Sequence, residues 1–323
     1  MTKMKTHSCI YCGSAELVSV EKVAAKAIVE AYDNSFNVPL SKLLTDNASD
    51  FALLKCRVCD LQWFSPLVSG DGEFYENLQQ HDWYYQEHKP EYDYARKLIH
   101  EDDHVLEVGC GKGVFGHLLA KNTAYHGLEF NHAAVEKAKT SGLQVEVASI
   151  ETHADKSANS YDIVCHFQVL EHVTNPRQFL EACVQALKPG GRLIVAVPAE
   201  DSFLSLIEGN WLGMPPHHLT RWSDQALLNA FRLLHLEKIE LWHESVAEIH
   251  QNLYQKTMLN YGFKSLFGLQ PRLERDQFFS KIADRLEKIN FFANWLGTRG
   301  EKRFEFSGRG HTVCAIGFKA SAS

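Results

Sequence analysis

Three glycines at alternate positions, Gly109, Gly111 and Gly113, lie between a short apolar run and a helical pattern. The apolar run covers residues 105–108 and carries one acidic residue, Glu107, near its end. Glycine lets the backbone approach a ligand closely, because a side chain at such positions would collide with it. A strand, a glycine turn and a helix N-terminus in this order predict a nucleotide-binding βα unit.

The spacing of the glycines indicates which ligand this turn binds. It is G-x-G-x-G, whereas a dinucleotide fingerprint requires G-x-G-x-x-G/A. Glu107 would repel a pyrophosphate, but it suits a ligand with an amino group and a sulfonium. Glu129 ends the next predicted strand, where a carboxylate can bind ribose hydroxyls. The pattern resembles motif I of class I S-adenosylmethionine (SAM) methyltransferases; the alternative is a tight turn that binds nothing.

Strand and helix patterns alternate from residue 104 onward, which predicts a parallel sheet covered by helices on both faces. We expect strands at residues 105–108, 125–129, 144–148, 161–167, 192–197 and 237–242, and helices at 114–121, 132–141, 176–187 and 223–234. The resemblance implies that a last strand, residues 311–319, enters antiparallel. The predicted fold class is therefore α/β, with a Rossmann-like, mostly parallel sheet.

Ligands of such sheets bind at the carboxyl ends of the strands. Residues 161–173 and 187–198 are also similar to two further methyltransferase motifs, FDxVxxxxVLEHV and LKPGGxLxxxxP. Three motifs in this order imply an enzyme that uses SAM as its cofactor. The residues that we assign to SAM binding are Glu107, Gly109, Cys110, Gly111, Gly113, Glu129, Phe130, Asn131, Ser149, Ile150 and Phe167.

Two C-x-x-C pairs, Cys9 with Cys12 and Cys56 with Cys59, precede this core. Two thiolates from each of two tight turns are what a tetrahedral Cys₄ zinc site requires. Four thiolates leave no open coordination position, so the zinc would be structural. The alternative is four reduced thiols that merely pack. Between the pairs we expect a helical insert at residues 20–32.

Two adjacent histidines, His217 and His218, follow two prolines in the loop after residue 198. The prolines fix φ and stiffen this loop, which should lie over the carboxyl end of the sheet. Methyl transfer needs an aligned acceptor and often removal of its proton, to which an imidazole with a pKa of about 6.5 is suited. We therefore predict His217 and His218 as catalytic bases. Alternatively, one stabilises the loop and the other contacts the substrate passively, and Glu171 with His172 is a rival pair.

The cysteine pairs, the aromatic segment at residues 74–94 and the histidine loop are together similar to bacterial zinc-ribbon class I methyltransferases. Such relatives often act on sugars, polysaccharide precursors or secondary metabolites. The aromatic residues, among them Trp83, Tyr84 and Tyr85, either contact the ligand or fill the core. We divide the chain into a zinc-ribbon module (1–72), a SAM-binding core with a lid helix (73–245), a helical insertion that is a lid or a dimer surface (246–310) and a last strand with the tail (311–323).

The acceptor is less well defined by the sequence than the cofactor. We expect methyl transfer to oxygen or nitrogen, less readily to carbon, of a small or sugar-like metabolite. One alternative is an RNA methyltransferase whose ribbon reads nucleic acid, but the net charge of −7 argues against a nucleic-acid partner. Another is a scaffold that binds SAM without turnover. A homodimer is one alternative for the oligomeric state, because the apolar insertion could be a dimer surface.

The distribution of apolar residues predicts neither a membrane-spanning helix nor a signal peptide. No apolar run approaches the length of about 20 residues that a membrane-spanning helix needs. The first ten residues contain no apolar segment of the kind found in signal peptides. We therefore expect a cytoplasmic protein with reduced cysteines.

Overall fold

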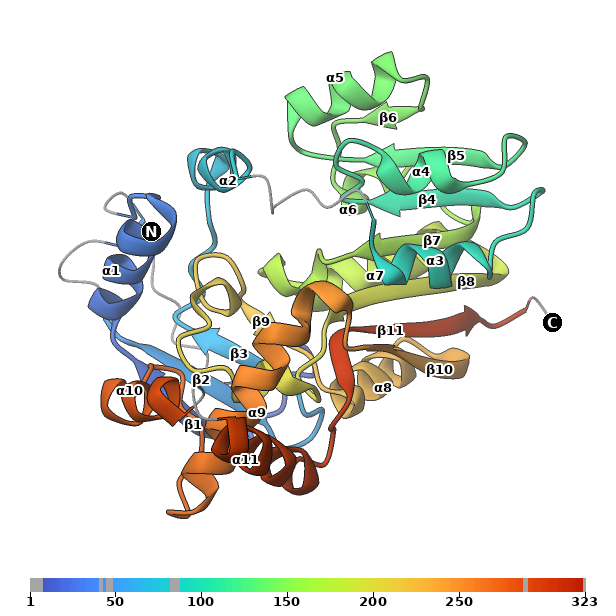
Figure 1. Cartoon of the computed structure of the whole chain (residues 1–323). Helices are drawn as coiled ribbons and strands as arrows, with labels where there is room; N and C mark the ends of the chain where they lie inside the picture. Colours follow the sequence, from blue (N-terminus) through green and yellow to red (C-terminus); the bar gives the residue numbers. More distant parts are fainter. Residues whose placement is uncertain (1–7, 41–42, 45–48, 82–87, 287–289, 322–323) are drawn as a thin grey trace.

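The computed structural model describes residues 8–40, 43–44, 49–81, 88–286 and 290–321, and it contains two sheets (Figure 1). The larger sheet has the order β10-β11-β8-β7-β4-β5-β6. In chain order its strands are β4 (His104–Val108), β5 (Ala124–Leu128), β6 (Val145–Glu146), β7 (Tyr161–Phe167), β8 (Leu187–Pro198), β10 (Leu236–Ser245) and β11 (Arg309–Lys319). Strands β4 to β8 are mutually parallel, and β11 runs antiparallel to both β8 and β10. The predicted α/β class with an antiparallel last strand is confirmed.

The order of the strands reverses at β4. Strand β5 follows β4 on one side of it, whereas β7 pairs with its other side. In open α/β sheets such a reversal leaves a crevice outside the carboxyl ends of the strands, where ligands bind. The carboxyl end of β4 carries the glycine turn, so the topology places that turn beside the crevice.

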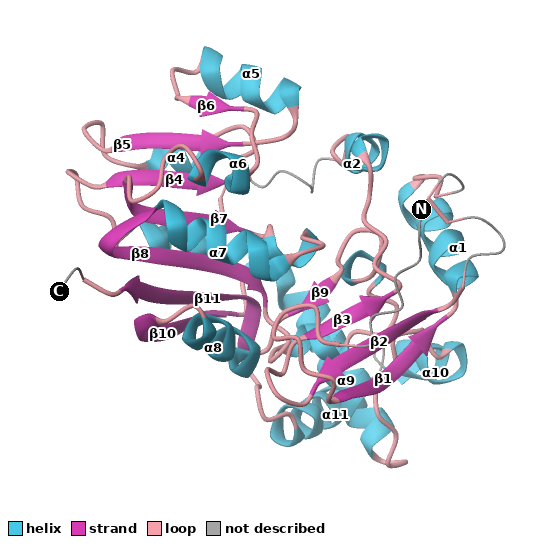
Figure 2. Cartoon of the chain, turned by 180° about the vertical axis from the view of Figure 1, so that it is seen from behind, coloured by secondary structure: helices cyan, strands magenta, loops and turns pink. Residues whose placement is uncertain are grey.

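Helices cover both faces of the larger sheet. Helices α3 (Pro90–Arg96) and α4 (Val114–Leu118) pack on one face through Tyr92 and Phe115. Helices α6 (Ile150–Ala154), α7 (Pro176–Ala186) and α8 (Asp224–Leu233) cover the other face, which Figure 2 shows from their side. Side-chain caps precede two of these helices. Asn175 precedes α7 and accepts a hydrogen bond from the Gln178 amide, and Ser223 precedes α8 and accepts one from the Ala226 amide.

The smaller sheet is antiparallel and has the order β1-β2-β3-β9. Its strands are β1 (Leu17–Val23), β2 (Phe51–Cys56), β3 (Gln62–Ser65) and β9 (Thr220–Arg221). The helix expected at residues 20–32 begins only at Ala25, as α1 (Ala25–Phe36). The first part of that prediction is wrong, because residues 17–23 satisfy their backbone by pairing with β2. The helical part buries Ile28 and Ala31, which its periodicity placed on one side, and it also buries Tyr32.

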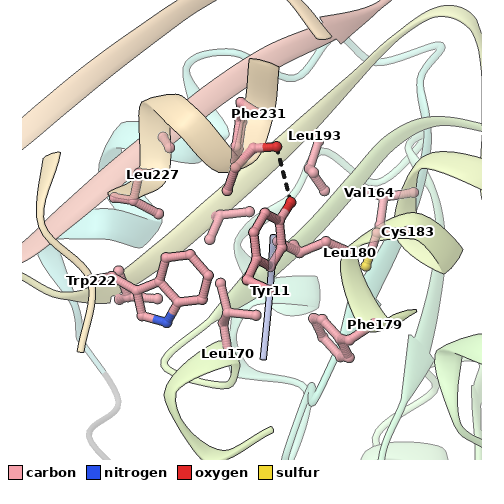
Figure 3. Close-up of a cluster of buried hydrophobic side chains, with 14 of the residues drawn as sticks. Tyr11, Val164, Leu170, Phe179, Leu180, Cys183, Leu193, Trp222, Leu227 and Phe231 are labelled. Carbon is pink, nitrogen blue, oxygen red and sulfur yellow. Dashed lines mark hydrogen bonds between the residues drawn. The ribbon is translucent and has the colours of Figure 1, made fainter. Parts of the chain in front are cut away.

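The cysteine-bearing module shares a hydrophobic core with the larger sheet. Tyr11 lies between Cys9 and Cys12, and its hydroxyl donates to the Ala230 carbonyl of α8 at 3.0 Å. Its ring meets Trp222 edge-on at 5.9 Å between centroids. Figure 3 shows this tyrosine surrounded by side chains of β7, β8, α7 and α8. Strand β9, which belongs to the segment after β8, also completes the smaller sheet, so the two parts are joined through both packing and hydrogen bonds.

The segment from residue 246 to 310 is helical in the part that is described. It contains α9 (Gln251–Ser265), α10 (Gln277–Leu286) and α11 (Asn290–Arg303). Helices α9 and α11 approach each other backbone to backbone: a Cβ at Gly262 would lie 2.0 Å from the Leu296 carbonyl oxygen, and one at Gly300 2.1 Å from that of Met258. A buried ion pair between Lys264 and Glu208 ties α9 to the loop after β8.

Two further observations bear on the sequence predictions. Among the described residues, no helix combines the length and the apolar character that a membrane span requires. Trp83, Tyr84 and Tyr85, for which a ligand contact was one prediction, lie outside the described residues.

Candidate active site

The glycine turn is held at the junction of β4 and β5. The amides of Gly109 and Cys110 both donate to the Leu128 carbonyl, at 2.7 and 3.0 Å. Gly109 has φ of +74°, and a Cβ there would lie 2.5 Å from Val169 Cγ2. Because the backbone is left-handed and crowded at this point, a glycine is required.

Glu129 organises the ligand side of this turn. Its Oε2 accepts from the Gly111 amide at 2.9 Å, and its Oε1 accepts from the Asn131 amide at 2.8 Å. Asn131 in turn caps α5 (His132–Thr140), and its side-chain amide donates to Gln79 Oε1 at 2.5 Å. Gln79 follows α2 (Gly72–Leu78), so a residue that the sequence did not single out reaches Asn131, one of the predicted SAM residues. No local pattern could have indicated Gln79, because its partner lies 52 residues away.

Glu107 is buried, with an exposed fraction of 1%. Its Oε2 accepts a hydrogen bond from the Tyr125 hydroxyl at 2.6 Å. Burial raises the pKa of Glu107 to about 8, against the opposing effects of Tyr125 and Lys89. A bound cation would restore the charged carboxylate. The buried carboxylate of Glu107 therefore fits a cationic group such as the ammonium or the sulfonium of SAM.

The other predicted SAM residues lie in varied environments. Ser149 caps α6, Ile150 is buried behind it, and Phe130 is 70% exposed. The ring of Phe167 packs on Tyr92 and Phe115 at 4.9 and 4.7 Å between centroids. Phe167 thus fills the core beneath α3 and α4. Cys110 is buried beside Val135 of α5, and Gly113 precedes α4 with φ of +80°. These assignments stay predictions, and the structure brings Glu107, the three glycines and Glu129 closest together.

Beside the SAM residues, Gln168 follows β7 with φ of +58°. Its side-chain amide donates to Glu91 Oε1 and to Thr312 Oγ1, each at 3.2 Å. This contact joins α3, β7 and β11 at the carboxyl edge of the sheet. No local pattern indicates this contact, since Glu91 and Thr312 lie 77 and 144 residues from Gln168.

The two predicted bases lie next to a third histidine. The rings of His217 and His218 stack at 4.6 Å, and the ring of His172 lies 4.6 Å from the first and 4.9 Å from the second. His172 ends the short helix η1 (Leu170–His172) that follows β7. Burial lowers the pKa of His217 to about 3, that of His172 to about 4, and that of His218 well below its ordinary value. The base role of His217 and His218 stays a prediction, and neutral imidazoles with such low pKa values are weak bases.

His166 in β7 allows a prediction about pH and stability. It is fully buried against Phe179, and neither ring nitrogen has a hydrogen-bond partner among residues that the structure describes. Burial lowers its pKa to about 3. The unfolded chain binds more protons below a pH of about 6.5, so this group's contribution to stability is present above that pH and is lost as the pH falls toward 3.

We expect His166→Leu to remove this acid sensitivity. Between pH 7 and pH 5 the wild type should lose about 2 kcal/mol more free energy of unfolding than the variant. Urea unfolding at both pH values measures the difference, with the exposed His100→Leu as control. Equal losses in wild type and His166→Leu would contradict the prediction.

The four cysteines of the predicted zinc site lie in one cluster. Their sulfur atoms all fall within 4.8 Å of one another, and Cys9 Sγ to Cys59 Sγ and Cys12 Sγ to Cys56 Sγ are each 3.5 Å apart. Zinc with Zn–S bonds of about 2.3 Å places its sulfurs roughly 3.8 Å apart. The Tyr11 and Cys59 amides also donate to cysteine sulfurs, at 3.5 Å each. The cluster fits a structural Cys₄ zinc site.

Comparisons with known proteins agree with this fold. A family model described as a methyltransferase domain matches residues 71–241. Curated relatives include the ubiquinone biosynthesis O-methyltransferase of Citrobacter koseri, 31% identical over 38% of this chain and 61% of that protein. The protein of the same name from Escherichia coli O7:K1 is 40% identical over 27% of this chain and 39% of its own length. The chain thus spans between about two fifths and three fifths of the length of these relatives.

Solved structures with a similar fold include a SAM-dependent methyltransferase from Archaeoglobus fulgidus, with a TM-score of 0.45 and 18% identity over 67% of this chain and 86% of that chain. Another is a possible histamine N-methyltransferase from Thermotoga maritima, with a TM-score of 0.45 and 19% identity over 71% of this chain and 87% of that chain. The sequence match covers more than half of the 323 residues. The protein therefore belongs to the methyltransferase-domain family.

Proposed function

We propose that this protein transfers the methyl group of SAM to an oxygen or nitrogen, less readily a carbon, of a small or sugar-like metabolite. The observation that carries the proposal is the edge that β4, β5 and β7 share. The ends of β4 and β5 hold Glu107, the glycine turn and Glu129. The segment after β7 holds His172, beside His217 and His218. Parallel strands end at one edge, so a SAM site and an acceptor site would adjoin.

SAM supplies an electrophilic methyl carbon on a sulfonium. The role of the protein is to hold it with Glu107, the turn amides and Glu129, and to align the acceptor. His217 and His218 would activate the acceptor, in the simplest form by direct removal of its proton.

Two observations favour a neutral small acceptor over RNA. The described part of the ribbon module has few cations, and two of them are paired: Lys55 with Asp60 at 2.6 Å and Lys26 with Glu30 at 3.6 Å. The chain as a whole is acidic, with a formal charge of −7. The names of the curated relatives, O-methyltransferases, support oxygen as the receiving atom.

A transfer assay tests this function. Protein and methyl-labelled SAM are incubated with cell extract that is afterwards separated into RNA and small metabolites. We expect label in the metabolite fraction, and we expect the His217→Ala/His218→Ala double variant to lose about 10²–10⁴-fold in rate. The exposed His100→Ala serves as control. Label in RNA would overturn the acceptor class, and SAM binding without any labelled product would favour the scaffold.

A further inference from the structure

A cluster of three histidines occupies the acceptor side of the site. Each of His172, His217 and His218 offers one ring nitrogen, and these nitrogens lie within 4.8 Å of one another. They come from two segments, η1 after β7 and the loop that follows η3 (Trp211–Gly213). Zinc bound to three imidazoles holds the nitrogens about 3.3 Å apart, with Zn–N bonds of about 2.0–2.1 Å. Small ring rotations would therefore close the set around a metal ion.

Two of the three rings already have the hydrogen bonds that metal-bound histidines make. His172 Nδ1 lies 2.6 Å from the His217 carbonyl oxygen, and His217 Nδ1 lies 3.0 Å from that of Leu212. A carbonyl only accepts, so Nδ1 carries the hydrogen in both rings and the lone pair is on Nε2. Donation of the remote N–H to a backbone carbonyl fixes the tautomer and the orientation of a histidine that coordinates a metal.

A buried carboxylate beside the cluster supplies an independent observation. Glu171 is 1% exposed, and neither of its oxygens has a hydrogen-bond partner among the residues that are described. Its Oε1 lies 3.8 Å from His172 Nε2. A buried carboxylate without partners is costly unless a cation or a donor approaches it. A divalent ion between the rings would provide that charge.

We propose that His172, His217 and His218 bind a Zn²⁺ ion next to Glu171, and that the open position of this ion takes the acceptor oxygen. The metal-binding part stands on its own; the acceptor part rests on the proposed function. Three protein nitrogens and one open position are the ligand set of catalytic rather than structural zinc. The site is separate from the Cys₄ cluster, whose four ligands leave no open position.

The ion gives the acceptor a route to its nucleophilic form. A hydroxyl bound to zinc loses its proton to solvent near neutral pH. The resulting oxygen attacks the methyl carbon, the C–S bond breaks with its electron pair staying on sulfur, and S-adenosylhomocysteine and a methyl ether are formed. Proton removal then requires no protonation of His217 or His218. The histidines act as ligands, in place of the direct base role above.

Counting the metal tests the proposal. The full chain as purified is equilibrated with excess Zn²⁺, freed of unbound metal and analysed for its zinc content. We expect the double variant His172→Gln/His218→Gln to retain one equivalent of zinc fewer than wild type. The exposed control His117→Gln should retain as much zinc as wild type. The difference is decisive, because the ribbon and the group His126, Glu146 and His153 could take up zinc in every variant. Equal zinc in wild type and double variant would overturn the proposal.

A second measurement starts from the wild-type protein, in which the histidine cluster is intact. Co²⁺ is added to wild-type protein whose ribbon is zinc-loaded, and the visible absorption is recorded. Absorption bands of nitrogen-coordinated Co²⁺ support the site if the single variant His172→Gln lowers the affinity for Co²⁺ by more than about 100-fold. Loss of a residue that only supports a ligand lowers metal affinity by about 10–100-fold. Absence of such bands overturns it. Methyl transfer by protein that lacks this ion would refute only the role of the metal. A bound ion without any methyl transfer would refute only the proposed function.

Discussion

Replacing Cys56 with alanine is expected to abolish zinc binding at the ribbon and to unfold the part of the molecule that surrounds it. A structural zinc site contributes about 10–16 kcal/mol of apparent binding free energy, which equals or exceeds the net stability of a typical domain, about 5–15 kcal/mol. Cys56 is fully buried and ends β2, so no water could replace its thiolate easily. Zinc content and thermal unfolding together measure the result.

The consequence should reach the larger sheet. Tyr11 lies between two of the cysteines and packs into the core of α7 and α8, where its hydroxyl is bonded to Ala230 (Figure 3). Loss of the cluster would release this ring and expose the face that it covers. We therefore expect one cooperative loss of structure and a strong decrease in SAM affinity.

Cys183→Ala is the matched control for this experiment. Cys183 is also a fully buried thiol, in α7, and it lies outside the cluster. The control should keep its zinc and lose only the packing of one sulfur, roughly 1 kcal/mol. If Cys56→Ala and Cys183→Ala lost the same stability with zinc unchanged, the four thiols would merely pack, which is the alternative that the sequence left open.

The sequence predicts well where neighbouring residues determine the structure. The bounds expected for β7, residues 161–167, are those observed, and its apolar run begins directly after the turn residues Asn159 and Ser160. The glycine turn and the cap of α8 by Ser223 were likewise indicated by residues within one turn of each other. Residues 17–23 show the opposite case: their pattern fits a helix as well as a strand, and pairing with β2 decides between them.

The parts of the site that could not be predicted depend on residues far apart in sequence. His172 meets His217 across 45 residues, and Asn131 meets Gln79 across 52. The single pair of residues in β9 joins the ribbon sheet from the segment after β8. Each of these contacts is fixed by the packing of whole elements, so no spacing along the chain reports it. For the same reason the sequence suggested His217 with His218 and, as a rival, Glu171 with His172, whereas the structure brings all three histidines together.

Replacing Glu129 with glutamine should weaken SAM binding by about 30- to 150-fold, which corresponds to roughly 2–3 kcal/mol. In the structure both carboxylate oxygens accept backbone amides, from Gly111 and from Asn131. Glutamine has one accepting oxygen and would point an NH₂ group at one of these donors. The change would therefore loosen the glycine turn and also remove the negative charge that we expect to bind the ribose hydroxyls. Calorimetric titration with SAM and with S-adenosylhomocysteine measures the loss.

Glu136→Gln is the control, because Glu136 is an exposed residue of α5 on the same side of the sheet. It makes the same chemical change and should leave both affinities within about twofold, because surface changes of this kind are worth less than about 0.5 kcal/mol. The Glu129→Gln variant should lose affinity for SAM and for S-adenosylhomocysteine by the same factor, since both ligands contain the ribose and only SAM contains the methyl group. A loss confined to SAM would place Glu129 near the sulfonium instead. An unchanged affinity for both would show that Glu129 serves only the turn, and Glu107 would then be the one carboxylate left to bind the cofactor.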